Sequence, residues 1–154
     1  EIICDKAASA GSSCAWGSFK SASNPCLRDI HEYILVYSKG EYKLPRSPED
    51  KENGRVDTIV KEEFIQQTKS IWSFNTESAK RVKHPAPFPV ELPRRCIEMY
   101  SFAGDVVLDP FLGSGSTAIA AIRTGRRYVG VDISQEYCEI AKSRIDAEVL
   151  ELKA

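Results

Sequence analysis

The chain has 154 residues, of which 42% are hydrophobic and 28% charged, and 21 lysines and arginines stand against 22 aspartates and glutamates. These values describe one globular domain or a piece of a larger one. No run of about 18 apolar residues occurs and the start is not basic, so we expect neither a membrane span nor a signal peptide.

Two strands are predicted in the first 40 residues. Glu1–Lys6 is short and apolar in its middle, and His31–Lys39 is dense in β-branched and aromatic residues. Ala7–Asn24, between them, is rich in glycine, serine and alanine and predicts a loop. Because the chain begins inside a strand-like run without a methionine, we expect further sequence to precede it.

The middle of the chain is more polar. Residues 41–79 carry many charges and turn residues, which predicts an exposed excursion with one short helix near Lys61–Gln67. The prolines of His84–Pro89 make a stiff extended run. A helix should follow, with its apolar positions spaced i, i+4 and i+7 and with Pro93 in its first turn. These apolar positions are Leu92, Cys96 and Met99.

The last 50 residues show an alternating strand and helix pattern. Val106–Leu108 predicts a buried parallel strand, Ala118–Ile122 a buried helix, and Arg127–Val131 a second strand. Ser134 can cap a third helix. The apolar face expected for that helix consists of Tyr137, Ile140, Ala141 and Ile145. This order is the βαβα unit of a doubly wound α/β sheet.

Cysteines and charges add two constraints. The five cysteines are an odd number without a C-x-x-C pair, so we expect free thiols in a reducing cytoplasm and no metal site. Residues 80–96 have a net charge of +4 whereas residues 41–79 have −2. The basic stretch could meet phosphate or form a solvated turn, and charge alone leaves both open.

A glycine motif follows the strand at Val106–Leu108. Gly113-x-Gly115-x-x-Ala118 fits the nucleotide-binding pattern G-x-G-x-x-G/A, and Asp132 lies 17 residues beyond Gly115. A P-loop is excluded because no lysine stands between Gly104 and Ala121.

Asp109 decides between the remaining ligands. Its carboxylate, at the carboxyl end of the strand, would repel the pyrophosphate of a dinucleotide and attract a cation. S-adenosylmethionine has no phosphate, carries an ammonium and a sulfonium group, and has ribose hydroxyls that Asp132 can accept. The alternative is that Asp109 only caps a turn.

These residues resemble a known family. Asp109-Pro-Phe-Leu-Gly-Ser-Gly-Ser-Thr117 resembles the motif D-P-F-x-G-x-G-T-T of the DNA methyltransferases that modify the exocyclic amino groups of adenine (N6) or cytosine (N4). His84-Pro-Ala-Pro-Phe-Pro-Val-Glu-Leu92 is similar to the segment before that motif in the circularly permuted β class. Gly125–Asp132, together with Tyr137 and Arg144, is similar to the final strand and helix of the class. Ser116 replaces the usual threonine and keeps the hydroxyl.

The resemblance implies a fold and a domain organisation. The fold would be α/β, the Rossmann-like S-adenosylmethionine-dependent methyltransferase fold, circularly permuted and here a partial sheet. Residues 1–40 would hold an outer strand pair, 41–79 a target-recognition insertion, and 80–154 the cofactor-binding part. The strands that normally lie between the two strand pairs are absent from this chain.

One motif of the family is missing. Its members carry a tetrapeptide [D/N/S]-P-P-[Y/F/W] that holds the target amino group and stacks on the flipped base. This chain contains no Pro-Pro pair, and Ser23-Asn24-Pro25-Cys26 is only a distant imitation. We therefore assign no catalytic residue within the chain and expect no methyl transfer from it alone.

The resemblance also implies binding residues. The expected cofactor-binding residues are His84, Pro85, Phe88, Asp109, Pro110, Phe111, Gly113, Gly115, Ser116, Thr117, Asp132 and Ile133. Double-stranded DNA would contact Trp16, Lys80, Arg81 and Lys83. The target-recognition insertion, residues 41–79, has a net negative charge, which is unfavourable for contact with DNA phosphates. The implied function is site-specific DNA methylation within restriction-modification, with adenine N6 or cytosine N4 as target.

Two other functions stay open. The chain could be a non-catalytic module that binds S-adenosylmethionine or nucleic acid, or one part of a split methyltransferase completed by a second chain or by self-association. An RNA or small-molecule methyltransferase would use a similar sheet, but rarely the Pro-Phe pair after the motif's aspartate.

Overall fold

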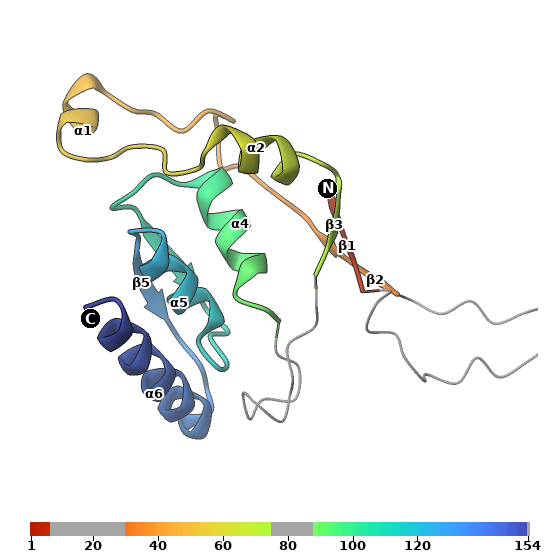
Figure 1. Ribbon diagram of the computed structural model, residues 1–154, viewed down its shortest axis with the longest axis vertical. Coiled ribbons are helices and arrows are strands. Elements are labelled where there is room, and N and C mark those ends of the chain that lie inside the picture. Colours follow the sequence, from red (N-terminus) through yellow and green to blue (C-terminus); the bar gives the residue numbers. More distant parts are fainter. Residues whose placement is uncertain (7–29, 75–87, 154) are drawn as a thin grey trace, which may run out of the picture.

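A computed structural model of the chain describes residues 1–6, 30–74 and 88–153 (Figure 1). The elements are β1 (Ile2–Asp5), β2 (His31–Ile34), α1 (Pro48–Glu52), α2 (Lys61–Gln67), β3 (Ile71–Ser73), α4 (Glu91–Tyr100), β4 (Val106–Asp109), α5 (Ser116–Arg123), β5 (Arg127–Gly130) and α6 (Gln135–Glu151). Over these residues no helix combines the length and the apolar character that crossing a bilayer requires.

The first sheet has the strand order β2-β1-β3. Strand β1 pairs antiparallel with β2 and parallel with β3. The predicted strand His31–Lys39 is too long: β2 covers only His31–Ile34, where it pairs with β1, and residues 35–39 pair with no described strand and are exposed. Strand β3 was not predicted, and its central residue Trp72 is only 1% exposed.

The second sheet confirms the predicted βαβα unit. Strands β4 and β5 are parallel, with Val106 opposite Arg127 and Asp109 opposite Gly130. Helix α5 connects them, and α6 follows with Ser134 as its N-cap, whose side chain accepts the N–H of Tyr137. Among the described strands, neither β4 nor β5 is hydrogen-bonded to the first sheet, which agrees with the expected partial sheet.

Helix α5 forms the centre of the core. It contacts both strands of the second sheet as well as α4 and α6. Small side chains allow these elements to pack closely against α5: Ala118, Ala120 and Ala121 are fully buried. Ile97 of α4 packs against this helix, and Ala141 and Ile145 of α6 pack on its other side.

Helix α4 has the predicted position but buries a different face. Pro93 lies in its first turn, as expected, and Pro93 and Ile97 are its buried residues. The predicted trio is only half-buried because α5 meets the helix along Ile97 rather than along Leu92, Cys96 and Met99. Burial raises the pKa of the Cys96 thiol to about 11. Cys96 and the other cysteines within the described residues are free thiols.

Within the part of the chain that the structure describes, one face of the second sheet is uncovered. Val106, Leu108 and Val129 point away from α5 and are 52%, 65% and 51% exposed. Register places Leu108 directly beside Val129, so the apolar side chains form one continuous strip. The strand predicted at Val106–Leu108 is therefore parallel as expected, but the prediction that it is buried is wrong on this face, because no described residue covers the strip.

Candidate functional site

The glycine loop, residues 109–117, leaves the carboxyl end of β4 and enters α5. Asp109 Oδ1 accepts the backbone N–H of Phe111 at 2.9 Å, and the N–H of Leu112 donates to the carbonyl of Val131 at 2.9 Å. The loop is thus tied to the segment that follows β5. Asp109 does cap a turn, and its second carboxylate oxygen is not needed for that contact.

Asp132 holds the same loop from the other strand. Its Oδ2 accepts the N–H of Gly113 at 2.8 Å, and its Oδ1 accepts the N–H of Ser134 at 2.9 Å. One carboxylate therefore joins the loop to the first turn of α6. A carboxylate oxygen can accept more than one hydrogen bond, including one from a hydroxyl group.

These contacts decide which ligand charge the loop accepts. A phosphate-binding loop offers free backbone N–H groups to the anion. Here the N–H groups of Phe111 and Gly113 already serve the carboxylates of Asp109 and Asp132. A phosphate would meet negative charge, whereas a cation or a hydroxyl donor would meet acceptors.

Close packing by α6 fixes the shape of the loop. Gly115 has a φ of +85°, and a Cβ added there would lie 3.1 Å from Cβ of Ala141 and 3.2 Å from its Cα. At Gly130 of β5 an added Cβ would approach the side chain of Leu112 to 2.6 Å, so that side chain would have to move. At Gly115 the positive φ and the close backbone of α6 together favour glycine.

Exposed apolar side chains flank the two carboxylates. Phe111, two residues after Asp109, is 85% exposed, and Ile133, next to Asp132, is fully exposed. Large apolar side chains beside polar acceptors at the carboxyl ends of parallel strands are typical of a ligand site. Ser116 is different: it is buried, and its hydroxyl donates to the carbonyl of Phe88 at 3.2 Å.

The structure thus brings most of the predicted cofactor residues together. Nine of the twelve lie on the glycine loop or directly after β5: Asp109, Pro110, Phe111, Gly113, Gly115, Ser116, Thr117, Asp132 and Ile133. The carbonyl of Phe88 joins them through Ser116. His84, Pro85 and the expected DNA contacts Trp16, Lys80, Arg81 and Lys83 lie outside the described residues. Within the described residues no cluster of metal-ligating side chains occurs.

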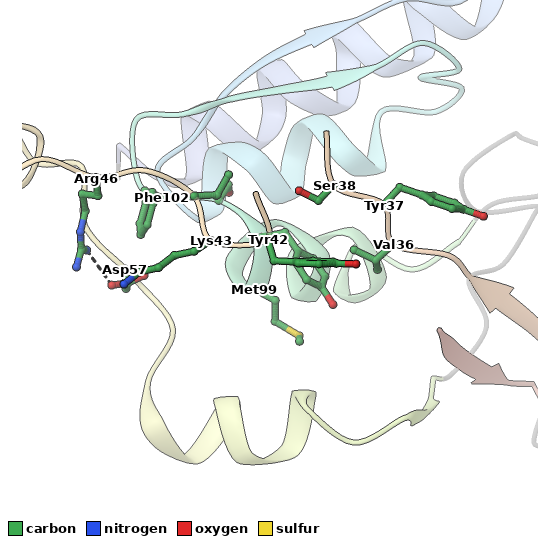
Figure 2. Close-up of a pocket in the computed structure, with 12 residues that line it drawn as sticks. Val36, Tyr37, Ser38, Tyr42, Lys43, Arg46, Asp57, Met99 and Phe102 are labelled. Carbon is green, nitrogen blue, oxygen red and sulfur yellow. Dashed lines mark hydrogen bonds and ion pairs between the residues drawn. The ribbon is translucent and has the colours of Figure 1, made fainter. Parts of the chain in front are cut away.

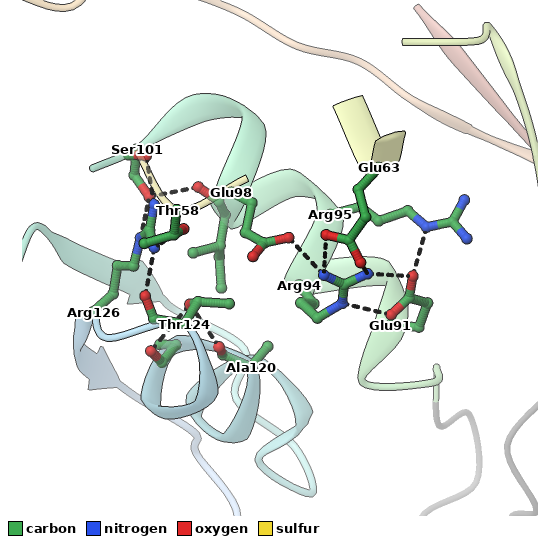
Figure 3. Close-up of polar contacts among 12 residues, drawn as sticks. Thr58, Glu63, Glu91, Arg94, Arg95, Glu98, Ser101, Ala120, Thr124 and Arg126 are labelled. Atoms are coloured by element: carbon green, nitrogen blue, oxygen red, sulfur yellow. Dashed lines mark hydrogen bonds and ion pairs between the residues drawn. The ribbon is translucent and has the colours of Figure 1, made fainter. Parts of the chain in front are cut away.

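A separate polar network fixes residues 55–58 to the core (Figure 3). The buried guanidinium of Arg126 donates to Thr58 Oγ1 at 2.6 Å and to the carbonyl of Ser101 at 2.7 Å. Burial is the largest single influence on Asp105 and would raise its pKa, but the hydrogen bonds from Arg55, at 2.8 Å, and from the N–H of Phe102 act together with the neighbouring guanidinium charges and lower that pKa. No sequence motif points to these contacts, because they join positions that are 25 to 68 residues apart.

A cavity of about 540 Å³ lies away from the glycine loop (Figure 2). Its walls are the segment around Tyr37 and Tyr42 and the end of α4 at Tyr100 and Phe102. Tyr100 and Phe102 precede the amino end of β4, whereas the glycine loop follows its carboxyl end. This cavity is therefore separate from the candidate site.

Several known proteins are similar to this chain in sequence. The sequence model of the N6/N4 DNA methylase family matches residues 2–143. The chain is 35% identical over 142 residues to the Type II methyltransferase M.MthZI of Methanothermobacter thermautotrophicus, covering 88% of this chain and 40% of that protein. It is 32% identical over 142 residues to the orphan methyltransferase M.BamHII of Bacillus amyloliquefaciens, covering 75% of this chain and 54% of that one.

A solved structure agrees with these relatives. The chain matches TTHA0409 of Thermus thermophilus, described as a candidate DNA modification methylase and crystallised with S-adenosyl-L-methionine. The TM-score is 0.68 at 36% identity, and the match covers 96% of this chain and 52% of that one. The chain therefore spans about half the length of the proteins that it matches.

Proposed function

The chain belongs to the N6/N4 DNA methylase family, and from that premise we propose that it is the cofactor-binding part of a site-specific DNA methyltransferase. The methyl group would pass from S-adenosylmethionine to adenine N6 or cytosine N4 in double-stranded DNA. The supporting observation is that two carboxylates and two exposed apolar side chains share one edge of the second sheet.

Each group at that edge suits one part of the cofactor. The carboxylate of Asp109 would hold the ammonium group, and Asp132 would accept the ribose hydroxyls while it keeps Gly113 in place. The exposed Ile133 would pack against the adenine ring. Phe111 would cover the methionine portion or line the path to the target base. The other predicted residues of the loop would shape it, and the segment His84–Pro89 would pass close to the methionine end of the cofactor.

The methyl transfer itself needs a second set of groups. The bound cofactor would supply an electrophilic methyl group on its sulfonium sulfur. The residues of this chain would hold that methyl at a fixed point and keep water from the sulfur, which is a positioning role. The target amino nitrogen has to be held in line with the sulfonium, and the chain contains no Pro-Pro tetrapeptide to hold it.

The uncovered strip on the second sheet supports a requirement for further polypeptide. Val106, Leu108 and Val129 together would cost stability if left in water. A covering segment would come from a longer form of the protein, from a second chain of a split methyltransferase, or from self-association. Double-stranded DNA would be met by the basic segment at Lys80–Lys83 and by Trp16.

A non-catalytic module that binds S-adenosylmethionine is the second candidate. These 154 residues contain the cofactor motif at Asp109–Thr117 but no Pro-Pro tetrapeptide, which is the pattern expected of such a module. The two candidates share the cofactor site and differ only in whether a completing partner restores methyl transfer.

Calorimetric titration of the chain with S-adenosylmethionine tests the cofactor site. We expect saturable binding of one equivalent, and no binding of NAD⁺, whose pyrophosphate would face the two carboxylates. Ile133→Ser should weaken binding without lowering the melting temperature, because Ile133 is fully exposed. Leu150→Ser, at an exposed position on α6, is the matched control and should change neither quantity. Equal affinity for the Ile133 variant and wild type would remove the adenine-packing role.

A further inference from the structure

Helix α6 reaches into the glycine loop with a cationic side chain. Nη1 of Arg144 donates to the carbonyl oxygen of Ser114 at 2.5 Å and to its hydroxyl oxygen at 2.8 Å. Ser114 is only 5% exposed. The guanidinium group therefore lies against the underside of the loop, about one helical turn after Ala141, which packs on Gly115.

The peptide that Arg144 contacts lies in a stretch of the loop where glycine gives the backbone freedom. Ser114 stands between Gly113 (φ +52°) and Gly115 (φ +85°), and glycine adopts either sign of φ at little cost. Rotating the Ser114–Gly115 peptide unit would turn the Ser114 carbonyl away from Arg144 and would also break the hydrogen bond from the N–H of Gly115 to the carbonyl of Leu112. The contact with Arg144 and the contact with Leu112 therefore oppose this rotation together.

The N–H groups of Phe111 and Gly113 donate to the carboxylates of Asp109 and Asp132. The Ser114–Gly115 peptide unit is held at both of its polar groups, and its N–H, which belongs to Gly115, donates to the carbonyl of Leu112 at 2.9 Å. The carbonyl of Ser114 is held from α6. A hydrogen bond from a charged donor to a buried carbonyl is among the stronger ones in a protein.

We propose that Arg144 is a positioning residue for the cofactor. It fixes the Ser114–Gly115 peptide with the carbonyl toward α6, and this keeps the loop in the bend that directs Asp109 and Asp132 at one ligand. The proposal rests on the proposed cofactor role of the loop. A purely structural role would consist of attaching α6 to the core, without an effect on the loop conformation.

Two variants separate these roles by cofactor affinity. Arg144→Gln removes the charged donor. Arg123→Gln breaks the pair between α5 and Glu148 of α6, whose two contacts are both 2.7 Å, and leaves the loop untouched. We expect both variants to lower the melting temperature, but only Arg144→Gln to weaken S-adenosylmethionine binding, by about tenfold to a hundredfold. Arg144→Lys should recover part of that affinity, because it restores a cationic donor.

A second measurement monitors the conformation of the loop in the absence of the cofactor. In ¹H–¹⁵N spectra of the unliganded chain, Gly113 and Gly115 should each give one sharp amide signal in wild type and in Arg123→Gln. Arg144→Gln should broaden or split both signals through exchange between two peptide orientations. Unchanged loop signals would overturn the positioning role, whatever the affinities. If wild type binds no cofactor and the loop signals still respond, the proposed function fails while the role of Arg144 in the loop stands.

Discussion

Asp132 accepts the backbone N–H of Gly113, 19 residues before it, at 2.8 Å. The carboxylate that follows β5 thereby closes the glycine loop that follows β4. A single side chain thus serves the loop and, in the proposed function, the ribose of the cofactor.

Replacing Asp132 should affect both stability and binding. We expect Asp132→Ala to lower the free energy of unfolding, because the N–H groups of Gly113 and Ser134 lose their acceptor. Cofactor binding should weaken by about 1.5–3 kcal/mol, the range for a hydrogen bond to a charged group. Chemical denaturation and calorimetry measure the two effects separately. Loss of stability with unchanged affinity would remove the ribose assignment.

Gly115 and Gly125 form a matched pair for testing close packing. Both have a positive φ, +85° and +73°, so alanine at either should cost about 1–2 kcal/mol from the backbone alone. An added Cβ meets Ala141 at Gly115 and meets nothing within 4 Å at Gly125. Gly115→Ala should therefore destabilise by about 1 kcal/mol or more beyond Gly125→Ala. Equal denaturation midpoints for the Gly115 and Gly125 variants would show that α6 moves enough to accommodate the new methyl group.

The stability of the chain should fall in acid partly through Glu148. The hydrogen bond from Arg123 lowers the pKa of Glu148 below its ordinary value of 4.5. A carboxyl whose folded pKa is lowered stabilises the fold above its unfolded pKa, and this contribution is lost as the pH falls through the folded pKa. The melting temperature of wild type should drop more steeply below about pH 4.5 than that of Glu148→Gln. If the melting temperatures of the two proteins fall in parallel as the pH is lowered, the ion pair of Arg123 and Glu148 does not contribute to stability.

The basic segment should set part of the salt dependence of DNA binding. Lys80 and Arg81 were predicted from the sequence to meet phosphate. Changing both to alanine should reduce the slope of log K against log salt by up to about two, close to one per phosphate contact. Lys51→Ala, on the exposed acidic helix α1, should leave the slope unchanged. The same slope in the double variant would place both residues away from the DNA backbone.

The chain by itself should not methylate DNA. Transfer requires a group that holds the amino nitrogen and an aromatic ring for the extruded base, and the sequence lacks the tetrapeptide that unites them. The check is a labelled-methyl transfer assay on the purified chain. Incorporation of label would refute the expectation, and Ser23-Asn24-Pro25 would then be the first segment to mutate.

The sequence alone predicted the parts of the fold that depend on neighbouring residues. The parallel strand before Asp109, the buried helix at Ala118–Ile122 and the cap at Ser134 all follow from local patterns of apolar, glycine and capping residues. The family match at residues 2–143 confirms the family that the glycine loop indicated. These features could be predicted because a strand, a turn or a cap is specified within a few positions.

Only the tertiary structure decided what distant segments do to each other. The pairing of β2 with β1 joins positions up to 32 residues apart, and that of β3 with β1 joins positions about 68 residues apart. The buried face of α4 depends on the course of α5, and Arg144 meets Ser114 across 30 residues. Local sequence patterns do not predict such contacts. Each contact depends on how distant segments pack against one another in the folded chain, and not on the conformational preference of one segment.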